Sequence, residues 1–363
     1  MKYENMYIDK HKIMPNSNIF THSIENSDKI FHYTSSDGLK SILKNKTLWF
    51  SDIRYMNDMM EIREGIKAMK EIAEESESED IRNITVPFYN EYLDKAADNL
   101  LNDNIYICSF SIGRDELPMW NYYTKDNACQ GYNVCFSIDP MMQSLIKINK
   151  DILDGCSISY GKVEYYKDSI KPLLENHFNA LFHIFLIKHP KYVQEILEKV
   201  VCELGKKFSM TEQERRSCNA QIVEFCSGEG MNISEIESNM LNIYKFDSCA
   251  LKFDQLQLEE PVCYIKNSSF EYEKEIRIII RIPKDKLEEL KKNRIYKERY
   301  CNGLKIPYIE LSFSQDAVEG ITVAPMNKDV NGETEIEKYM DEQGYDISRM
   351  RYGIKKSEVP IRY

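Results

Sequence analysis

The chain lacks the long apolar runs that would place it in a membrane. No stretch of the sequence approaches the roughly 20 consecutive apolar residues that a membrane-spanning helix requires. The N-terminal sequence MKYENMYIDKHKIMP also lacks the apolar core of a signal peptide. The sequence therefore predicts a cytoplasmic protein without a membrane partner.

Sequence patterns for several common kinds of chemistry are missing as well. There is no glycine-rich phosphate loop, no dinucleotide-binding fingerprint and no Ser-His-Asp order typical of a hydrolase. The ten cysteines form no CxxC pair and no ligand cluster with the six histidines. We therefore expect reduced cysteines that pack as small core residues, and no metal site.

Positive charge is in short supply. The 48 Lys and Arg residues are outnumbered by 59 Asp and Glu residues, which gives a net charge of −11. We therefore expect no strong non-specific binding of nucleic acid, because its phosphates are repelled by an acidic surface. A metal-dependent nuclease is also disfavoured, since the carboxylates show no recognised metal-ligand spacing.

The composition that remains is typical of a globular protein, with 363 residues, 42% apolar and 29% charged. Residues 1–28 are polar and are predicted to be irregular. Residues 29–363 are predicted to form a single α+β domain with a helical insertion at about 167–245. Because strands do not alternate regularly with helices, we expect two small, mostly antiparallel sheets with helices around them.

Hydrophobic periodicity predicts the individual elements. Helices are expected over 38–44, 57–74, 81–101, 118–123 and 334–343. Strands are expected over 29–34, 47–51, 105–111, 131–138, 157–166, 262–265, 272–282, 304–313 and 320–323.

The first group of polar residues lies where a predicted strand ends in His32, Tyr33 and Thr34. Ser35, Ser36 or Asp37 can cap the helix that follows. Polar groups at the ends of rigid elements are typical of binding sites, although His32 could equally be a hydrogen-bonded core histidine. Nearby candidates on the following elements are Trp49, Ser51, Asn57, Asp58 and Glu61.

The second group is the segment CSFSIGRDELPMWNYY. Ser109 and Ser111 share one face of a predicted strand and could bind a ribose. Trp120 or Tyr123 could form a wall for a planar ring, while the alternative is that these aromatic residues fill the core.

The third group is the strand YEKEIRIII. Alternation predicts that Glu273, Glu275 and Arg277 project from one face, and the isoleucines from the other. This arrangement is either a surface ladder of ion pairs or the charged floor of an active site. Neighbouring carboxylates repel, so one should hold a proton near neutrality unless Arg277 neutralises it. A fourth segment, RYCNGLKIPYIELSF, with Arg299, Lys305 and Tyr308, is interpreted as mainly structural.

Together these segments resemble a bacterial family known as domain of unknown function 2971. The matching blocks are HYTSSDGLKSILKNKTLWFS, MND followed by Glu61, CSFS with DELPMW, KNSSFEYEKEIR and LKIPYIEL. The resemblance extends in blocks over about residues 30–363, with the helical middle matched least. Phe270 stands where many relatives are expected to have tryptophan.

A more distant resemblance, to the ADP-ribosyltransferase superfamily, implies a chemistry. The strand ending in HYT, the helix GLKSIL and the strand LWFS are similar to the start of that fold. By this resemblance His32 would hold the ribose next to nicotinamide, and Ser109 or Tyr123 would flank the ring. Glu275, or Glu273, would orient the ribose and the acceptor.

The resemblance thus implies an enzyme that consumes NAD and transfers ADP-ribose to a macromolecular acceptor or to water, without a metal. A toxin or anti-phage effector would fit. Further NAD-contacting candidates are Tyr33, Thr34, Ser51, Ser111, Trp120 and Arg277. The alternative is a non-enzymatic module that uses the same pocket to bind a nucleotide or a partner protein.

Overall fold

The computed structural model describes most of the chain outside about residues 166–261. The described residues are 6–9, 12–15, 29–55, 59–76, 79–124, 129–165, 198–199, 202, 209–217, 262–301, 303–327 and 332–361. They divide into two compact units. Unit 1 comprises residues 1–62, 99–166 and 264–363, and unit 2 comprises residues 63–98 and 167–263.

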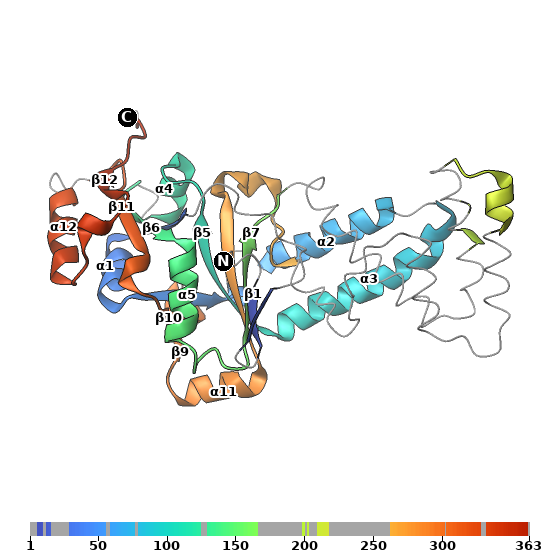
Figure 1. The fold of residues 1–363 in the computed structure, drawn as a ribbon, viewed down its shortest axis with the longest axis horizontal. Helices are drawn as coiled ribbons and strands as arrows, with labels where there is room; N and C mark the ends of the chain where they lie inside the picture. Colours follow the sequence, from blue (N-terminus) through green and yellow to red (C-terminus); the bar gives the residue numbers. More distant parts are fainter. Residues whose placement is uncertain are drawn as a thin grey trace. The chain divides into compact units, whose positions relative to one another are not determined.

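Unit 1 is built on a ten-stranded sheet (Figure 1). Eight strands follow the order β12-β11-β6-β3-β5-β4-β10-β9, and β8 and β7 branch from β5. All pairs are antiparallel except the parallel pair β11 and β12. The strands are β3 (Lys29–Thr34), β4 (Thr47–Asp52), β5 (Asn104–Ser111), β6 (Tyr132–Ser137), β7 (Ser157–Lys162), β8 (Glu275–Ile282), β9 (Tyr296–Cys301), β10 (Leu304–Ser312), β11 (Val318–Val323) and β12 (Gly353–Lys356).

The prediction of an α+β fold with mostly antiparallel pairing is confirmed, but the prediction of two small sheets is wrong. One large sheet forms because β5 pairs along its whole length with β8, and β8 pairs in turn with β7. A separate antiparallel hairpin, β1 (Met6–Asp9) and β2 (Lys12–Pro15), lies within the residues that were predicted to be irregular.

The sheet branches at β5, and this branching determines where the candidate residues lie. On one edge of β5, β4 pairs at Ser51 and Asp52. Further along the same edge, β3 pairs only through Phe31, which lies opposite Ser111. Between these two contacts, residues 108–110 of β5 pair with neither strand. The strands β3 and β4 therefore separate beside the middle of β5.

One face of the sheet is covered by four helices. These are α1 (Ser36–Asn45), α5 (Ile138–Ile148), α11 (Lys284–Lys292) and α12 (Gly332–Glu342) (Figure 1). Their apolar residues join the sheet residues Phe50, Phe110, Phe136 and Ile278 in the main core. We call this side the helix-covered face.

The start of α1 follows the sequence closely. Ser35 caps the helix, since its hydroxyl accepts from the Gly38 N–H at 3.2 Å. Leu39, Ile42 and Leu43 are buried, as their spacing predicts. This helix joins β3 to β4 and thereby holds the HYT and LWFS segments on neighbouring elements.

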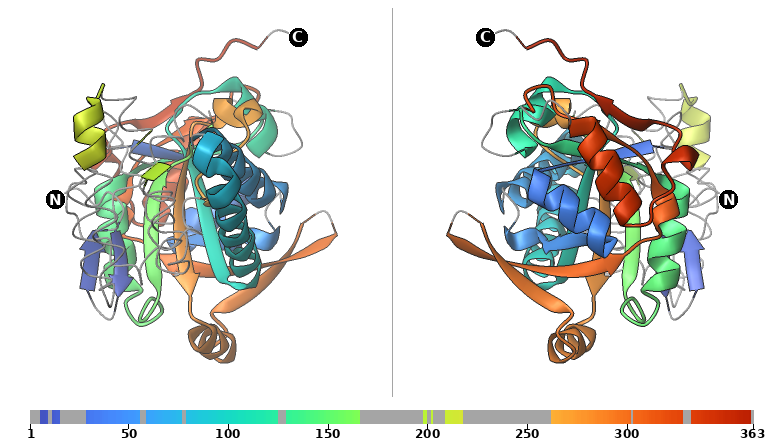
Figure 2. Two further views of the ribbon diagram at one scale, coloured as in Figure 1. Left: turned by 90° about the vertical axis from the view of Figure 1, so that its right-hand side faces the viewer. Right: turned by 90° about the vertical axis from the view of Figure 1, so that its left-hand side faces the viewer.

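On the opposite face, a smaller core forms under α4 (Leu117–Tyr123) and the 3-10 helix η4 (Ser268–Glu273). It contains Phe31, Tyr33 and Trp120. We call this side the α4 face. The hairpin of β9 and β10 extends outward from the rest of the sheet (Figure 2).

Unit 2 contains most of α2 (Met59–Ser76) and α3 (Glu79–Asn102), two long helices that the sequence predicted. Lys70 and Asp94 join them through an ion pair of 2.6 Å. Of the predicted helical insertion at 167–245, only residues 198–199, 202 and 209–217 are described, so this prediction lies almost wholly outside the described residues. No helix among the described residues is long and apolar enough to span a membrane.

The tight packing of β8 gives a stability prediction. Ile278 is fully buried in the main core, so Ile278→Ala should lower the free energy of unfolding by about 2–5 kcal/mol. The matched variant Ile148→Ala removes a side chain that is 51% exposed, and should cost less than about 0.5 kcal/mol. Urea unfolding of both variants measures the difference, and equal losses would contradict the assigned core.

Candidate functional site

Four charged side chains form a buried network at the start of β8. Lys266 Nζ lies 2.6 Å from Glu273 Oε2 and 3.3 Å from Glu275 Oε2. Arg277 contacts both oxygens of Glu275, through Nε at 2.9 Å and Nη2 at 3.0 Å. Each of the four residues is at most 7% exposed. Two positive and two negative charges therefore neutralise one another away from water, and we call this the carboxylate network.

The backbone before β8 differs from the predicted strand. Glu273 ends the 3-10 helix η4, and Lys274 turns the chain with a left-handed φ of 46° before the strand begins at Glu275. The prediction that Glu273 lies on the strand is therefore wrong. Its carboxylate still reaches the network, because Lys266 lies between the two glutamates.

Hydrogen bonds to β5 hold this turn in place. The Ser111 hydroxyl donates to the Glu273 carbonyl at 2.6 Å and accepts from the Gly113 N–H at 2.9 Å. The Ile112 N–H donates to the Lys274 carbonyl at 3.0 Å. Ser111 is fully buried and its hydroxyl is used in these contacts, so it positions Glu273 instead of facing a ligand.

The two carboxylates of the network have opposite pKa shifts. Burial alone would raise the pKa of Glu275, but Arg277 and Lys266 overcome this effect and hold it at about 2. The Ser109 hydroxyl adds to the lowering from beside the carboxylate, although it makes no hydrogen bond within normal geometric limits. For Glu273, burial outweighs the attraction of Lys266 and raises the pKa, and repulsion from Glu275 adds to the rise. Glu275 is therefore ionised at neutral pH, and Glu273 takes up a proton at a higher pH than Glu275 does.

Two tyrosines complete the network. The Tyr123 hydroxyl donates to Glu273 Oε1, and the Tyr165 hydroxyl accepts from the Glu275 N–H at 2.8 Å. Burial is the main cause that raises the pKa of both phenols, and the neighbouring glutamates add to it. Tyr123 is 37% exposed, so it connects Glu273 to the surface.

Aromatic side chains surround this point on the surface. The Tyr122 ring lies 5.8 Å from that of Tyr272, and Tyr272 lies 6.3 Å from Phe270. Lys266 Nζ lies 4.9 Å from the Phe270 ring centre. Tyr122 is 58% exposed. We call Tyr122, Tyr123, Phe270 and Tyr272 the aromatic rim.

His32 lies on the other side of the sheet from the carboxylate network. Phe31 is opposite Ser111 in the register, and Ser111 is opposite Glu275. Directly paired residues share a face of a sheet, so Phe31 and Glu275 point to the α4 face and His32 points to the helix-covered face. The His32 ring accordingly lies 5.5 Å from that of Phe110. His32 and Glu275, which the resemblance assigns to one ribose, therefore point to opposite faces of the sheet.

His32 lies where β3 and β4 separate. Its Nδ1 is 3.0 Å from the Ser109 carbonyl, which can only accept, so Nδ1 carries the proton and Nε2 presents a lone pair. Burial lowers the pKa of His32, the bond to Ser109 opposes this, and the charge of Arg299 lowers it again. The imidazole is therefore neutral at pH 7.

The other residues of the HYT segment have structural contacts. The Tyr33 hydroxyl donates to the Gly113 carbonyl at 2.9 Å and accepts from the Glu116 N–H at 3.2 Å. Burial raises the pKa of this phenol. Thr34 packs against the start of α1, where a Cβ on Gly38 would lie 2.1 Å from the Thr34 hydroxyl oxygen. Both residues join the strand to the following segments.

Trp120 is a core residue, so the prediction that it forms a wall for a ligand ring is wrong. It is fully buried, its ring packs edge-on to that of Tyr33 at 4.7 Å, and its indole N–H donates to Asp115 at 2.6 Å. Tyr123, the other candidate for this wall, reaches the surface.

Ser51 does not contact the carboxylate network. Its hydroxyl accepts from Arg299 Nη2 at 3.1 Å, and the Arg299 guanidinium lies 5.3 Å from the Trp49 ring centre. Trp49 also packs on Tyr308 at 4.5 Å. Arg299, interpreted from the sequence as mainly structural, thus contacts both Trp49 and Ser51.

Lys266 and Tyr165 are the site residues that the sequence did not reveal. The one available signal for Lys266 was its place at the head of KNSSFEYEKEIR, because two glutamates close together require nearby positive charge. Asn57 and Asp58 lie outside the described residues, as does the side chain of Glu61.

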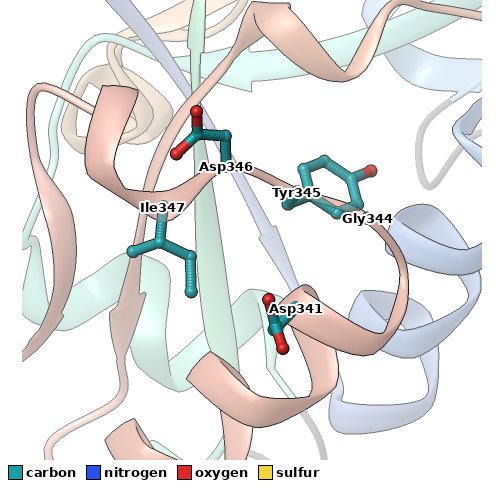
Figure 3. A pocket seen from close by; sticks show the side chains of 5 residues that line it. All are labelled: Asp341, Gly344, Tyr345, Asp346 and Ile347. Atoms are coloured by element: carbon teal, nitrogen blue, oxygen red, sulfur yellow. The ribbon is translucent and has the colours of Figure 1, made fainter.

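Other parts of the described chain have fewer groups suited to catalysis or ligand binding. No group of three or more His, Cys, Asp or Glu side chains that could hold a metal occurs among the described residues. Burial raises the pKa of the Cys108 thiol to about 12. The free thiols are Cys108, Cys129, Cys135, Cys156, Cys202 and Cys263. A hollow lined by Asp341, Gly344, Tyr345, Asp346 and Ile347 lies beside α12 (Figure 3). Its Tyr345 hydroxyl already donates to the Leu43 carbonyl at 3.1 Å, and the Asp346 carboxylate accepts from the Ser348 N–H at 3.2 Å.

Comparison with known proteins gives no independent assignment. A scan against models of protein families, a search of curated proteins and a search of solved structures each found no match. The resemblances to family 2971 and to the ADP-ribosyltransferases therefore stay predictions.

Removing one cation from the network should destabilise the protein. Arg277→Gln leaves Glu275 with one buried counter-charge, and should lower the free energy of unfolding by about 3–5 kcal/mol at pH 7. The pKa of Glu275 is lowered from 4.5 to about 2, so its stabilising contribution is complete above pH 4.5 and is lost as the pH falls toward 2. The difference between the variant and the wild type should therefore shrink below pH 4.5.

The matched control is Arg281→Gln on the same strand. Arg281 pairs with Asp103 at 3.4 Å at the surface, and its loss should cost less than about 1 kcal/mol. Urea unfolding at pH 7 and pH 3.5 measures both variants. Equal effects of the two substitutions at pH 7 would contradict the assigned network.

Proposed function

We propose that the chain is an enzyme of ADP-ribosyltransferase type that cleaves the bond between nicotinamide and ribose in NAD. The observation that carries the proposal is the pair of glutamates with opposite pKa shifts beneath an aromatic rim. Environments that push two neighbouring carboxylates apart in pKa are typical of sites with separate acid–base roles. NAD is the substrate that the sequence resemblance implies.

Glu273 is the carboxylate with the reactive role. Its oxygens accept from Tyr123 and Lys266, which orient it. When the C–N bond breaks, nicotinamide leaves with the bonding electron pair and positive charge develops on the ribose. An ionised Glu273 stabilises that charge. A water molecule or a side chain of a macromolecule then attacks the same carbon and passes its proton to Glu273.

Glu275 and the aromatic rim have supporting roles in this scheme. Arg277 contacts both oxygens of Glu275, so this carboxylate fixes the position of Lys266. Glu273 instead bonds the partly exposed Tyr123. Exposed Tyr122 and half-buried Tyr272 offer flat surfaces on which the nicotinamide ring stacks. His32 has no part in bond cleavage here, because the register directs it to the opposite face. A cellular role as a toxin or an anti-phage effector stays a prediction.

A non-enzymatic binding module is the second candidate. It is favoured by one observation: Glu275 already has partners on both oxygens, as Glu273 does. A network of this kind could serve only to hold η4 and the aromatic rim in place for a nucleotide or a partner protein.

The first functional test is release of nicotinamide from NAD by the purified chain, with cell lysate as a source of acceptors. Glu273→Gln keeps the size of the side chain but removes the carboxylate, and should reduce the rate about 100-fold or more. The control Glu116→Gln removes a nearby carboxylate whose partner is Lys274 at the surface, and should leave the rate unchanged.

Two results separate the candidates. The binding module would be favoured if the wild type bound NAD without releasing nicotinamide, and if Tyr122→Ala weakened that binding. Equal rates in wild type and Glu273→Gln would contradict the proposed role of Glu273.

The pH dependence of turnover gives an independent test. The reaction uses ionised Glu273, whose pKa lies above its ordinary value of 4.5. Turnover should therefore fall as the pH is lowered, with a midpoint above 4.5, in a pH–rate profile of nicotinamide release. A profile that stays flat down to pH 4.5, while circular dichroism shows a folded chain, would contradict this assignment.

A further inference from the structure

Arg299 is unusual among the cations of the β9–β10 hairpin. Lys297 pairs with Glu310 at 2.5 Å, and Lys305 pairs with Glu298. Among the described residues, no carboxylate pairs with Arg299, and its Nε is buried without a hydrogen-bond partner. A buried N–H donor without an acceptor is costly, so this position favours an incoming acceptor group.

The side chain of Arg299 is nevertheless held in a defined position. The guanidinium lies over the Trp49 ring at 5.3 Å, and Nη2 donates to the Ser51 hydroxyl at 3.1 Å. Stacking on an aromatic ring fixes the plane of a guanidinium while its edge stays able to donate. Preorganised donors of this kind bind a ligand without first losing side-chain freedom.

The register places these residues together. Ser51 on β4 is opposite Tyr308 on β10, and Tyr308 is opposite Lys297 on β9. Trp49, Ser51 and Arg299 therefore share one face by strand alternation. The positive charge of Arg299 also acts where β3 and β4 separate. There it contributes to lowering the pKa of both His32 and Cys108.

We propose that Arg299 and Ser51, beside the ring of Trp49, form a binding site for a phosphate group. The planar fork of a guanidinium matches two oxygens of a phosphate, and the Ser51 hydroxyl donates to a third. Trp49 is 36% exposed, which leaves ring surface for a base attached to the phosphate. The site goes beyond the proposed NAD chemistry, because it requires neither Glu273 nor turnover.

Tryptophan fluorescence provides the test in the full-length chain, because Trp49 is partly exposed and Trp120 is fully buried. Inorganic phosphate, AMP and adenosine are titrated separately. Saturable binding of phosphate and AMP is expected, with none for adenosine at the same concentrations. Tighter binding of AMP than of phosphate would identify a nucleotide as the source of the phosphate, and equal binding would identify free phosphate.

Variants then locate the site. Arg299→Gln should weaken the binding of phosphate at least about 10-fold. The control Lys297→Gln makes the same charge change on the same strand at a residue with a carboxylate partner, and should change Kd by less than about fivefold. If Arg299→Gln fails to fold by circular dichroism, Ser51→Ala serves in its place and should also weaken binding.

The proposal would be overturned if the wild type bound neither phosphate nor AMP saturably. It would also be overturned if Arg299→Gln and Lys297→Gln weakened phosphate binding equally, or if folded Ser51→Ala and Arg299→Gln bound phosphate as tightly as the wild type. Failure of NAD cleavage would have no bearing on it, since the titration measures binding alone.

Discussion

The buried contact of Glu275 with Arg277 and Lys266 is the interaction on which the rest of the site depends. A carboxylate without these cations would be strongly destabilising at this depth, and it lies on β8, which pairs with strands on both edges. Lys266 also binds Glu273 and so fixes η4 against the sheet. One neutral network thus joins the centre of the sheet to the aromatic surface around Tyr123.

The branching of the sheet at β5 creates two distinct chemical environments. On one edge, pairing with β8 brings Ser109 beside Glu275. On the other edge, β3 and β4 separate, and the carbonyl of the same Ser109 accepts from His32. The candidate reaction site and the candidate phosphate site therefore flank the same strand. Because Phe50 packs in the main core, strand alternation places Ser51 on the same face as Glu275. The two sites are separated because they lie on opposite edges of β5.

Much of the fold could be predicted from local pattern, but pairing between strands could not. Ser35 and the apolar spacing after it predicted α1, and the run of isoleucines predicted β8. A single sequence does not reveal that β5 pairs with β8 along its length, so the large sheet was missed. The turn at Lys274 broke the expected alternation, which displaced Glu273 from the strand. Lys266 could not be predicted as a site residue, because a buried ion pair across a turn leaves no periodic pattern in the sequence.

Burial and two cations separate the pKa values of the two glutamates. The most direct measurement is a carboxyl NMR titration of the full-length chain labelled with carbon-13 at the glutamate side chains, with assignments from Glu273→Gln and Glu275→Gln. Glu273 should titrate above pH 4.5, while Glu275 should stay ionised until the pH approaches its pKa of about 2. Titration of both near 4.5 would contradict the buried network and the roles that follow from it.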